Sequence, residues 1–370
     1  MKSIKSILQI AAIFILFNVL IFFIGWNVWE WLTISFHLQN LYIYCFIIVL
    51  LSYSFVIGRF SKHLSIFRTI GYIWFGFFQY CLLLLPLADL LIFVIKMTSS
   101  SWRIAIFPIG LSVLCLMFII LSYGLFNAYS PIVRKYAITI PKKNVNINEM
   151  RVAVASDMHF GRLSGVSHLK RLVKIIKGIK PDLILLPGDI IDDEAEPFID
   201  KKMGAIMAEL QAPLGVFGVL GNHEYYGGQI PTFINLMNDI NITILTDEVI
   251  TIGDSFHLLG RKDKTDKNRK SFAQLLEDVD HSYPIIAMDH QPQDLEAAQK
   301  CGVDILLSGH THRGQMAPNH LITKKMYELD WGYLKKDQLH AFVSSGFGFW
   351  GPPFRIGSRS EVLEIHIKFI

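Results

Sequence analysis

The first third of the chain is almost free of charged side chains, and this feature constrains the fold most. Up to about Phe126 the 370-residue sequence is apolar, whereas Lys, Arg, Asp and Glu become frequent beyond that point. A helix needs about 20 apolar residues to cross a hydrocarbon core of about 30 Å. Four runs are long enough, at 7–28, 41–58, 70–95 and 104–126. The sequence therefore predicts an N-terminal block of four transmembrane helices over residues 1–128.

The basic residues near the ends of these runs predict the orientation of the block, because they favour the cytoplasmic side. Lys2 and Lys5 precede the first run, four more basic residues lie from Arg134 to Lys143, and the first loop has no Lys or Arg. Both termini and the soluble part are therefore expected on the cytoplasmic side of a cell (inner) membrane. A signal peptide in place of the first run is the alternative, but the run is too long and three more follow.

One ionisable side chain, Asp89, lies well inside an apolar run. A carboxylate at membrane depth suggests a function, yet Asp89 is near the end of its run, where its side chain could reach the interface. The rest of the block suggests no transport pathway, so we expect it to serve as an anchor in the lipid bilayer.

The overall charge and the cysteines argue against two further classes of protein. A net charge of +4 over 370 residues does not require a nucleic-acid partner. The four cysteines have no close spacing, so they indicate neither a disulfide framework nor a thiolate metal site.

Beyond the membrane block, short β-rich runs alternate with amphipathic stretches. Residues 129–150 are expected to form a linker and a first strand, and residues 151–370 a soluble domain. Strands that alternate with helices indicate an α/β domain with largely buried sheets. The predicted strands are Tyr136–Ile140, Arg151–Ser156, Leu183–Leu186, Val216–Leu220, Ile242–Leu245, Phe256–Leu259, Pro284–Met288, Asp304–Leu307, Ala341–Ser344 and Val362–Ile367.

Clusters of potential metal ligands follow five of these strands directly. They are Ser156–His159, Gly188–Asp193, Gly221–Glu224, Asp289–His290 and Gly309–His312. The loops at strand ends are where α/β folds collect binding residues. Asp, Asn and imidazole ligands without thiolate suit Mn²⁺, Fe or Zn²⁺, and imidazole disfavours a site for Mg²⁺ or Ca²⁺ alone. Each cluster is weak evidence by itself, but five in this order predict a metal site.

This ordered set resembles the calcineurin-like metallophosphoesterase superfamily over about 151–370, and residues 309–315 with 344–355 are similar to its membrane-associated cell-envelope branch. The resemblance implies a four-layer α/β sandwich of two central mixed β-sheets flanked by helices, with two divalent metal ions, of which manganese is favoured. One ion would take Asp157, His159 and His312, the other Asn222, His290 and His310, and Asp189 would bridge them.

The same resemblance implies hydrolysis of a phosphoester or pyrophosphate bond by attack of a metal-bridging hydroxide. His223, which is not needed as a ligand, would assist the leaving group. Two arginines are candidates for contact with the substrate. Arg313 occupies a position where this branch often has Gly, and it either contacts phosphate or points to solvent; Arg355 could offer a bidentate contact. The charged segment Arg261–Lys270 is a solvated loop, a mobile, anion-attracting lid or a contact for acidic lipid headgroups.

A short segment, part of it a strand, separates the last apolar run from Asp157. The active site is therefore expected near the bilayer surface, and a membrane-lipid-linked substrate is the first hypothesis. The alternatives are a membrane-tethered phosphodiesterase for soluble nucleotides or small esters and a catalytically silent metal-binding scaffold. The sequence leaves open the metal pair, monoester against diester, and the oligomeric state.

Overall fold

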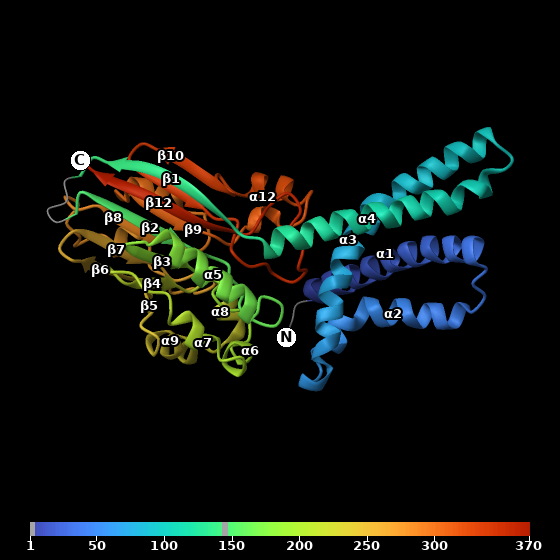
Figure 1. The fold of residues 1–370 in the computed structure, drawn as a ribbon, viewed down its shortest axis with the longest axis horizontal. Helices are drawn as coiled ribbons and strands as arrows, with labels where there is room; N and C mark the ends of the chain where they lie inside the picture. The colour runs from blue at the N-terminus through green and yellow to red at the C-terminus, as the bar shows by residue number, and fades with distance from the viewer. Residues whose placement is uncertain (1–3, 143–146) are drawn as a thin grey trace. The chain divides into compact units, whose positions relative to one another are not determined.

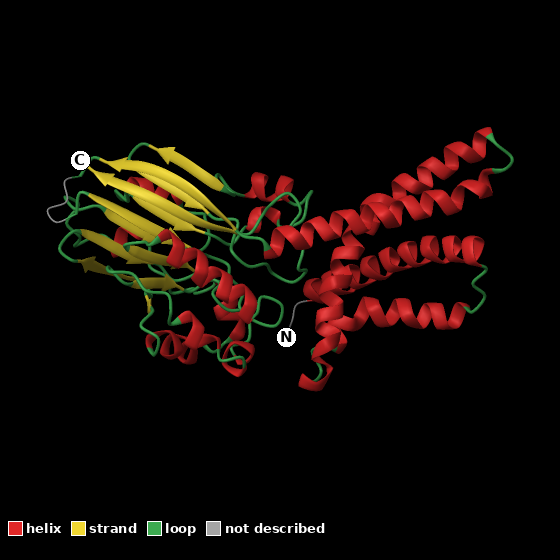
Figure 2. Ribbon diagram, in the orientation of Figure 1, coloured by secondary structure: helices red, strands yellow, loops and turns green. Residues whose placement is uncertain are grey.

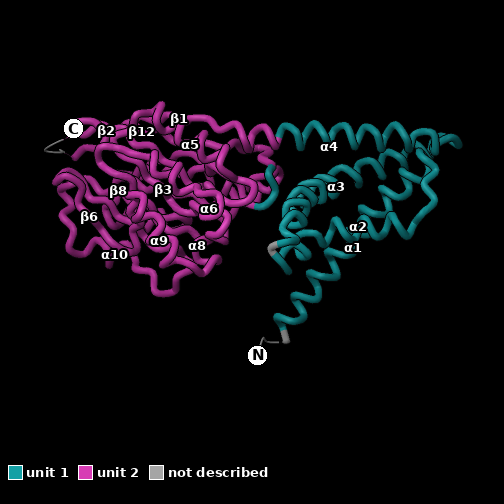
Figure 3. The backbone as a smooth tube through the Cα atoms, turned by 60° about the horizontal axis from the view of Figure 1, so that its bottom comes forward, with its two compact units in different colours: residues 1–123, 351–353 teal, residues 124–350, 354–370 magenta. Residues whose placement is uncertain are grey.

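The computed structural model describes residues 4–142 and 147–370, so Lys2 and Lys143, used above for orientation, lie outside the described residues (Figure 1). Contacts within the chain separate two compact units (Figure 3). The first comprises Met1–Tyr123 and Gly351–Pro353, and the second comprises Gly124–Trp350 and Phe354–Ile370. Figure 2 shows that the strands of the described residues lie in the second unit.

The first unit contains the predicted membrane block as apolar helices. They are α1 (Ile4–Phe36), α2 (Leu41–Ile57), α3 (Ser65–Thr98) and the start of α4 (Ile106–Tyr129), with short 3₁₀ turns at Lys62–Leu64 and Trp102–Ala105. Three segments of the described residues are long and apolar enough to cross a membrane, namely Lys5–Phe36, Ser65–Thr98 and Trp102–Tyr129. The 17-residue helix α2 is shorter, at about 25 Å. The predicted four-helix block is therefore present, with three full-length spans and one short apolar helix.

The second unit is built on two six-stranded sheets. The first sheet has the order β1-β12-β2-β3-β4-β5, and the second has the order β10-β11-β9-β8-β7-β6. The first sheet comprises β1 (Ile132–Ile140), β12 (Glu361–Phe369), β2 (Glu149–Val154), β3 (Leu183–Pro187), β4 (Val216–Val219) and β5 (Thr243–Ile244). The second comprises β10 (Gly332–Lys336), β11 (Leu339–Val343), β9 (Ile305–Ser308), β8 (Ile285–Met288), β7 (Phe256–Gly260) and β6 (Glu248–Ile252).

Both sheets are mixed. In the first sheet β12 pairs antiparallel with β2 and parallel with β1, and the remaining pairs are parallel. In the second sheet the antiparallel pairs β10–β11 and β6–β7 close the two edges, and parallel pairs lie between them. Parallel neighbours bring the carboxyl ends of their strands to one edge of each sheet. The predicted ligand loops are therefore collected at one edge of each sheet.

Three apolar cores separate four layers, which confirms the predicted sandwich. Val152 and Val154 of β2 face the core between the two sheets, whereas Ala153 and Ala155 face the helix-covered core of the first sheet. That outer core is covered by α5 (Val166–Ile179), α7 (Met203–Met207) and α9 (Ile230–Asn238). The outer core of the second sheet is covered by α10 (Phe272–Leu275) and α11 (Leu295–Lys300). Shorter elements are α6 (Glu196–Asp200), α8 (Asn222–Gly227), η3 (His312–Gly314) and α12 (His320–Met326).

The strand predictions omit two edge strands, β6 and β10. Both contain only partly buried and exposed residues, and β10 contains Lys335 and Lys336. An edge strand with one solvated side needs fewer apolar residues than a central strand, so the sequence of β10 resembles a loop, whereas β6 carries a strand signal in Val249, Ile250 and Ile252. The first strand also begins earlier than predicted, at Ile132, and only Ser130 and Pro131 separate it from α4.

The last turn of α4 belongs to the second unit and is bonded to the segment 354–360. The carbonyl of Gly124 accepts the backbone N–H of Arg355 at 2.9 Å, and Asn127 Nδ2 donates to the Arg355 carbonyl at 3.1 Å. The backbone N–H of Ser360 also donates to the Asn127 carbonyl at 3.2 Å. The last carbonyls of a helix have no partner within it, so this segment satisfies part of the helix end and is fixed by it.

Candidate metal centre

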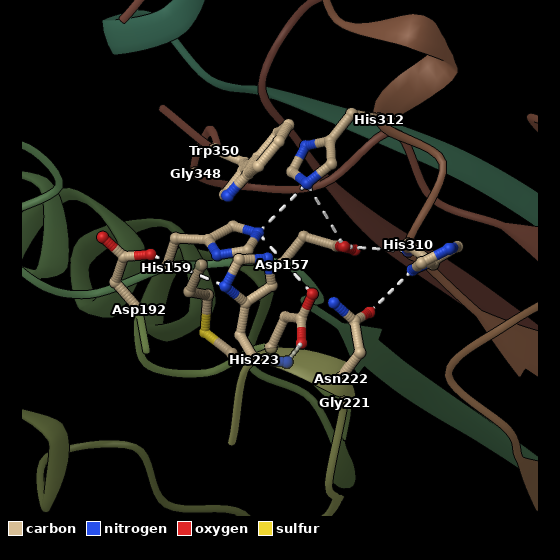
Figure 4. A network of polar contacts seen from close by, with 12 residues as sticks. Asp157, His159, Asp192, Gly221, Asn222, His223, His310, His312, Gly348 and Trp350 are labelled. Carbon is tan, nitrogen blue, oxygen red and sulfur yellow. Dashed lines mark hydrogen bonds and ion pairs between the residues drawn. The ribbon is translucent and has the colours of Figure 1, made fainter. Parts of the chain in front are cut away.

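The seven predicted ligands converge at the strand ends, and both sheets contribute to them. Figure 4 labels Asp157, His159, Asn222, His310 and His312 among them. Asp157, His159, Asp189 and Asn222 follow strands of the first sheet, whereas His290, His310 and His312 follow strands of the second. The site therefore lies where the two sheets meet at their carboxyl ends. Each ligand comes from a loop that a buried strand holds in place.

Asp157, His159 and His312 form the first group. Each offers one ligand atom, and the three atoms lie within 4.8 Å of one another. The Nε2 atoms of His159 and His312 are 3.0 Å apart, and His312 Nε2 is 3.5 Å from Asp157 Oδ1. These three side chains point toward one position, as a metal ion requires.

Asp189, His290 and His310 form the second group, and their ligand atoms also lie within 4.8 Å of one another. Asn222 Oδ1 joins them at 2.8 Å from His310 Nδ1 and 3.2 Å from His290 Nε2. Asp189 Oδ2 is 3.1 Å from His290 Nε2 and 3.7 Å from His159 Nε2. This carboxylate oxygen therefore faces both groups.

The buried charges and unpaired atoms of the site fit cations. Asp157 is 0% exposed, and its Oδ2 atom has no hydrogen-bond partner within the described part of the chain. A buried carboxylate oxygen without a partner is costly. Burial also lowers the pKa of His159 and His312 well below the usual range, so these imidazoles are neutral and free to act as ligands. Among the described residues the site thus supplies oxygen and nitrogen donors, which suit Mn²⁺, Fe or Zn²⁺.

The backbone of the ligands is strained. Positive φ angles occur at Asp157 (51°), His159 (44°), Asp189 (51°), His310 (72°) and His312 (48°). Such angles are uncommon outside Gly and cluster at functional sites. Two glycines give the carboxylates room, because a Cβ at Gly221 would lie 2.1 Å from Asp189 Oδ1 and one at Gly309 would lie 2.0 Å from Asp157 Oδ2.

His223 lies beside the ligands, at the start of α8. Its backbone N–H donates to Asp189 Oδ1 at 2.9 Å, and its ring stands edge-on to that of His159, with centroids 4.6 Å apart. The Nδ1 atom is 2.7 Å from Asp193 Oδ1. Burial alone would lower the pKa of His223, but the hydrogen bond to Asp193 and the nearby charges of Asp189 and Asp192 raise this pKa to about 9. The imidazole is therefore protonated at neutral pH and can donate a proton.

Glu224 ties two ligand loops together. Its Oε2 atom accepts the backbone N–H groups of Asp189 at 3.1 Å and Gly221 at 2.7 Å, and Oε1 accepts that of Ile191 at 3.0 Å. Burial and the charge of Asp189 raise the pKa of this carboxyl to about 8. These hydrogen bonds both hold the ligand loops and cap the start of α8.

The two arginines that the sequence suggests as substrate contacts both bind to other parts of the protein. Arg355 is 0% exposed. It donates to the Gly348 carbonyl from Nε at 2.9 Å and from Nη2 at 2.6 Å, and its Nη2 is 3.0 Å from His312 Nδ1. Its donors are therefore turned to the protein interior and not to a phosphate in an open site. The guanidinium of Arg313 stacks on the ring of Trp331, 4.0 Å from its centroid.

Two arginines of the charged segment Arg261–Lys270 are held in ion pairs, so at these positions the segment is neither solvated nor free to move as a lid. Arg261 Nη1 lies 2.9 Å from Asp289 Oδ2 and 2.8 Å from Asp294 Oδ2, and Arg269 pairs with the same two carboxylates. Because Asp289 precedes the ligand His290, these ion pairs hold one end of β8. The sequence shows the charges but not that their partners lie on a different loop.

Two aromatic residues lie near the site that no sequence pattern connects with it. The rings of Tyr226 and Trp350 lie 5.6 and 6.0 Å from that of His223, centroid to centroid. Trp350 comes from a loop far along the chain, and no local motif connects it with His223. Asp193 ends the predicted cluster Gly188–Asp193, and its contact with His223 depends on the fold.

The sequence model of a family described as Calcineurin-like phosphoesterase matches residues 150–314. A metallophosphoesterase of Aquifex aeolicus (strain VF5) is 30% identical over 255 residues, which cover 67% of this chain and 95% of the relative. A metallophosphoesterase of Helicobacter pylori (strain J99 / ATCC 700824) is 32% identical over 225 residues, or 59% of this chain and 60% of the relative. The chain thus spans about three-fifths of the length of that relative.

A third relative is described by name as a transmembrane protein. The Danio rerio "Transmembrane protein with metallophosphoesterase domain" is 28% identical over 262 residues, or 66% of this chain and 60% of the relative. The fold, the two ligand groups and these matches place the chain in the class of metallophosphoesterases. The chain belongs to the calcineurin-like metallophosphoesterase family, as its five ligand clusters indicated.

Proposed function

We propose that the protein is a phosphoester hydrolase that uses two divalent metal ions, with Mn²⁺ favoured over Fe and Zn²⁺. Asp157, His159 and His312 would hold one ion, Asn222, His290 and His310 the other, and Asp189 both. The observation that carries this assignment is the position of Asp189 Oδ2, which is 3.1 Å from His290 Nε2 and 3.7 Å from His159 Nε2. Two such ions lower the pKa of water and clamp phosphate oxygens.

His223 is the proton donor for the leaving group in this proposal. A water oxygen forms a new bond to phosphorus as the bond to the leaving oxygen breaks, the leaving oxygen takes the proton of His223, and the proton released by the water then restores His223. Because Asp193 occupies Nδ1, the proton comes from Nε2. The Asp193 carboxylate at 2.7 Å favours the charged imidazole before the reaction. Arg355 acts as a positioning residue for His312 and is no longer proposed to contact substrate, whereas Arg313 stays a candidate for that contact.

The substrate is proposed to be a membrane-lipid-linked phosphoester or pyrophosphate. Three spans long enough for a membrane precede the domain, and Ser130 and Pro131 alone connect α4 to β1. The loop charges support a catalytic domain on the cytoplasmic side of the inner membrane. A phosphodiesterase for soluble nucleotides or small esters is the alternative outcome of the test.

The test uses the full chain in detergent, loaded with Mn²⁺, and a chromogenic phosphodiester. We expect turnover that falls by more than about 100-fold in Asp189→Asn, while Asp239→Asn on the exposed end of α9 behaves like the wild type. Hydrolysis that survives Asp189→Asn would contradict the metal assignment. Long-chain and short-chain lipid phosphoesters are then compared, and equal kcat/KM for the two would contradict the lipid-linked substrate and favour small soluble esters.

A further inference from the structure

Two large aromatic side chains are left exposed beside His223. Tyr226 is 64% exposed and Trp350 is 57% exposed, whereas Phe347 and Phe349 of the same loop as Trp350 are 0% and 3% exposed. The rings of Tyr226 and Trp350 are inclined at 67° and 63° to the His223 imidazole. Exposed aromatic rings grouped at a site are typical of ligand contacts.

Hydrogen bonds and helix geometry hold both rings in place. Gln315, which is 8% exposed, donates from Nε2 to the Trp350 carbonyl at 2.8 Å and accepts the Trp350 backbone N–H on Oε1 at 2.9 Å. Tyr226 lies three residues after His223 on α8, so the two side chains share one side of the helix. Trp350 is therefore bonded to the segment that carries His312, and Tyr226 lies on the same helix as Asn222. Figure 4 shows Trp350 beside the histidine cluster.

We propose that Tyr226 and Trp350 form the subsite for the leaving group, and that this group carries a planar ring. The inference rests on the proposed function, in which the leaving oxygen takes its proton from His223. That oxygen must lie within hydrogen-bond reach of His223, and the group attached to it then lies against the two rings. Flat rings stack on aromatic side chains with a preference that flexible chains lack.

Two carboxylates occupy the Nδ1 side of the His223 ring. Asp193 Oδ1 and Asp192 Oδ1 lie 2.7 and 3.7 Å from His223 Nδ1, so Nε2 is the atom left to face the leaving oxygen. A nucleoside or an aryl alcohol carries the planar ring that the proposed subsite would bind.

The first measurement is kcat/KM of the full chain in detergent for two diesters, diphenyl phosphate and bis(2,2,2-trifluoroethyl) phosphate. The second diester has an activated leaving group without a ring. We expect the phenyl-to-trifluoroethyl ratio of kcat/KM to fall about 10-fold in Trp350→Ala and in Tyr226→Ala. Trp350→Phe should restore most of it. Tyr333→Ala on β10, which removes a 39% exposed ring elsewhere, is the matched control and should keep the wild-type ratio.

Binding of phenylphosphonate and methylphosphonate to the Mn²⁺-loaded protein, measured by calorimetry, separates this inference from the proposed function. A phenyl preference that both alanine variants lose supports the subsite even if turnover is absent. Equal losses for ring-bearing and ring-free ligands would mean that the rings only position His223, and unchanged ratios would mean that they do not touch the leaving group. Either result overturns the inference without affecting the metal assignment.

Discussion

Arg355 Nη2 lies 3.0 Å from Nδ1 of His312, on the side of that ring away from Asp157. The same arginine is hydrogen-bonded through its backbone to Gly124 and Asn127 in the last turn of α4. A buried guanidinium thus connects the end of a membrane-span helix with a metal ligand. The orientation of the His312 ring depends on a contact that lies outside the ligand loops.

Replacement of this arginine should weaken metal binding. In Arg355→Met the His312 ring loses its neighbour and the Gly348 carbonyl loses two donors, so we expect metal affinity to fall by about 10- to 100-fold. The free energy of unfolding should fall by on the order of 3 kcal/mol. Metal content after dialysis and chemical denaturation measure the two effects. Arg171→Met, on the exposed face of α5, is the control, and an equal loss there would refute the positioning role.

Removal of the carboxylate beside His223 should slow turnover and leave the metal centre intact. Asp193 Oδ1 lies 2.7 Å from His223 Nδ1 and helps raise the pKa of that imidazole. In Asp193→Asn we expect kcat to fall by about 10- to 100-fold with unchanged metal content. Steady-state kinetics and elemental analysis check this. A variant with normal kcat would show that the proton donor does not need this partner.

Metal removal should destabilise the second unit. Without cations, Asp157 Oδ2 is a buried oxygen that has no partner among the described residues. A ligand at 100 times its Kd stabilises a fold by about 2.7 kcal/mol, so chelation should lower the melting temperature by on the order of 5 °C. Calorimetry with and without a chelator measures the shift. Asp189→Asn should show a smaller shift, and an equal one would place the stabilising ions elsewhere.

His168 should make stability fall in mild acid. Burial lowers the pKa of His168 from 6.5 to about 4. As the pH falls below about 6.5, this imidazole therefore binds a proton in the unfolded chain but stays neutral in the folded chain. Stability is therefore complete above about pH 6.5 and declines as the pH falls to about 4, by up to roughly 3 kcal/mol. Urea unfolding across this range should show a flatter pH dependence in His168→Gln. Parallel curves for the variant and the wild type would contradict the prediction.

The sequence predicted the positions of the candidate metal ligands at strand ends where they directly follow a buried strand. Asp157, Asp189 and His310 each come after a continuous apolar run, so a local pattern identified both the strand and the ligand. The edge strand β10 was missed because solvent contact removes that pattern, whereas the missed β6 does contain the apolar residues Val249, Ile250 and Ile252. The contacts of Arg355 with His312 and of Trp350 with His223 could not be predicted, because they join loops that only the folded sheets bring together.

The central position of the C-terminal strand β12 affects the order in which this domain can fold during synthesis. It lies between β1, which directly follows the last membrane-span helix, and β2. Residues 132–140 therefore leave the ribosome long before their pairing partner at residues 361–369 exists. Until that strand arrives, the first sheet is split and β1 offers an unpaired edge. We expect the domain to complete its fold only after synthesis has passed residue 369, so late interruption of translation would leave an aggregation-prone membrane protein without an assembled site.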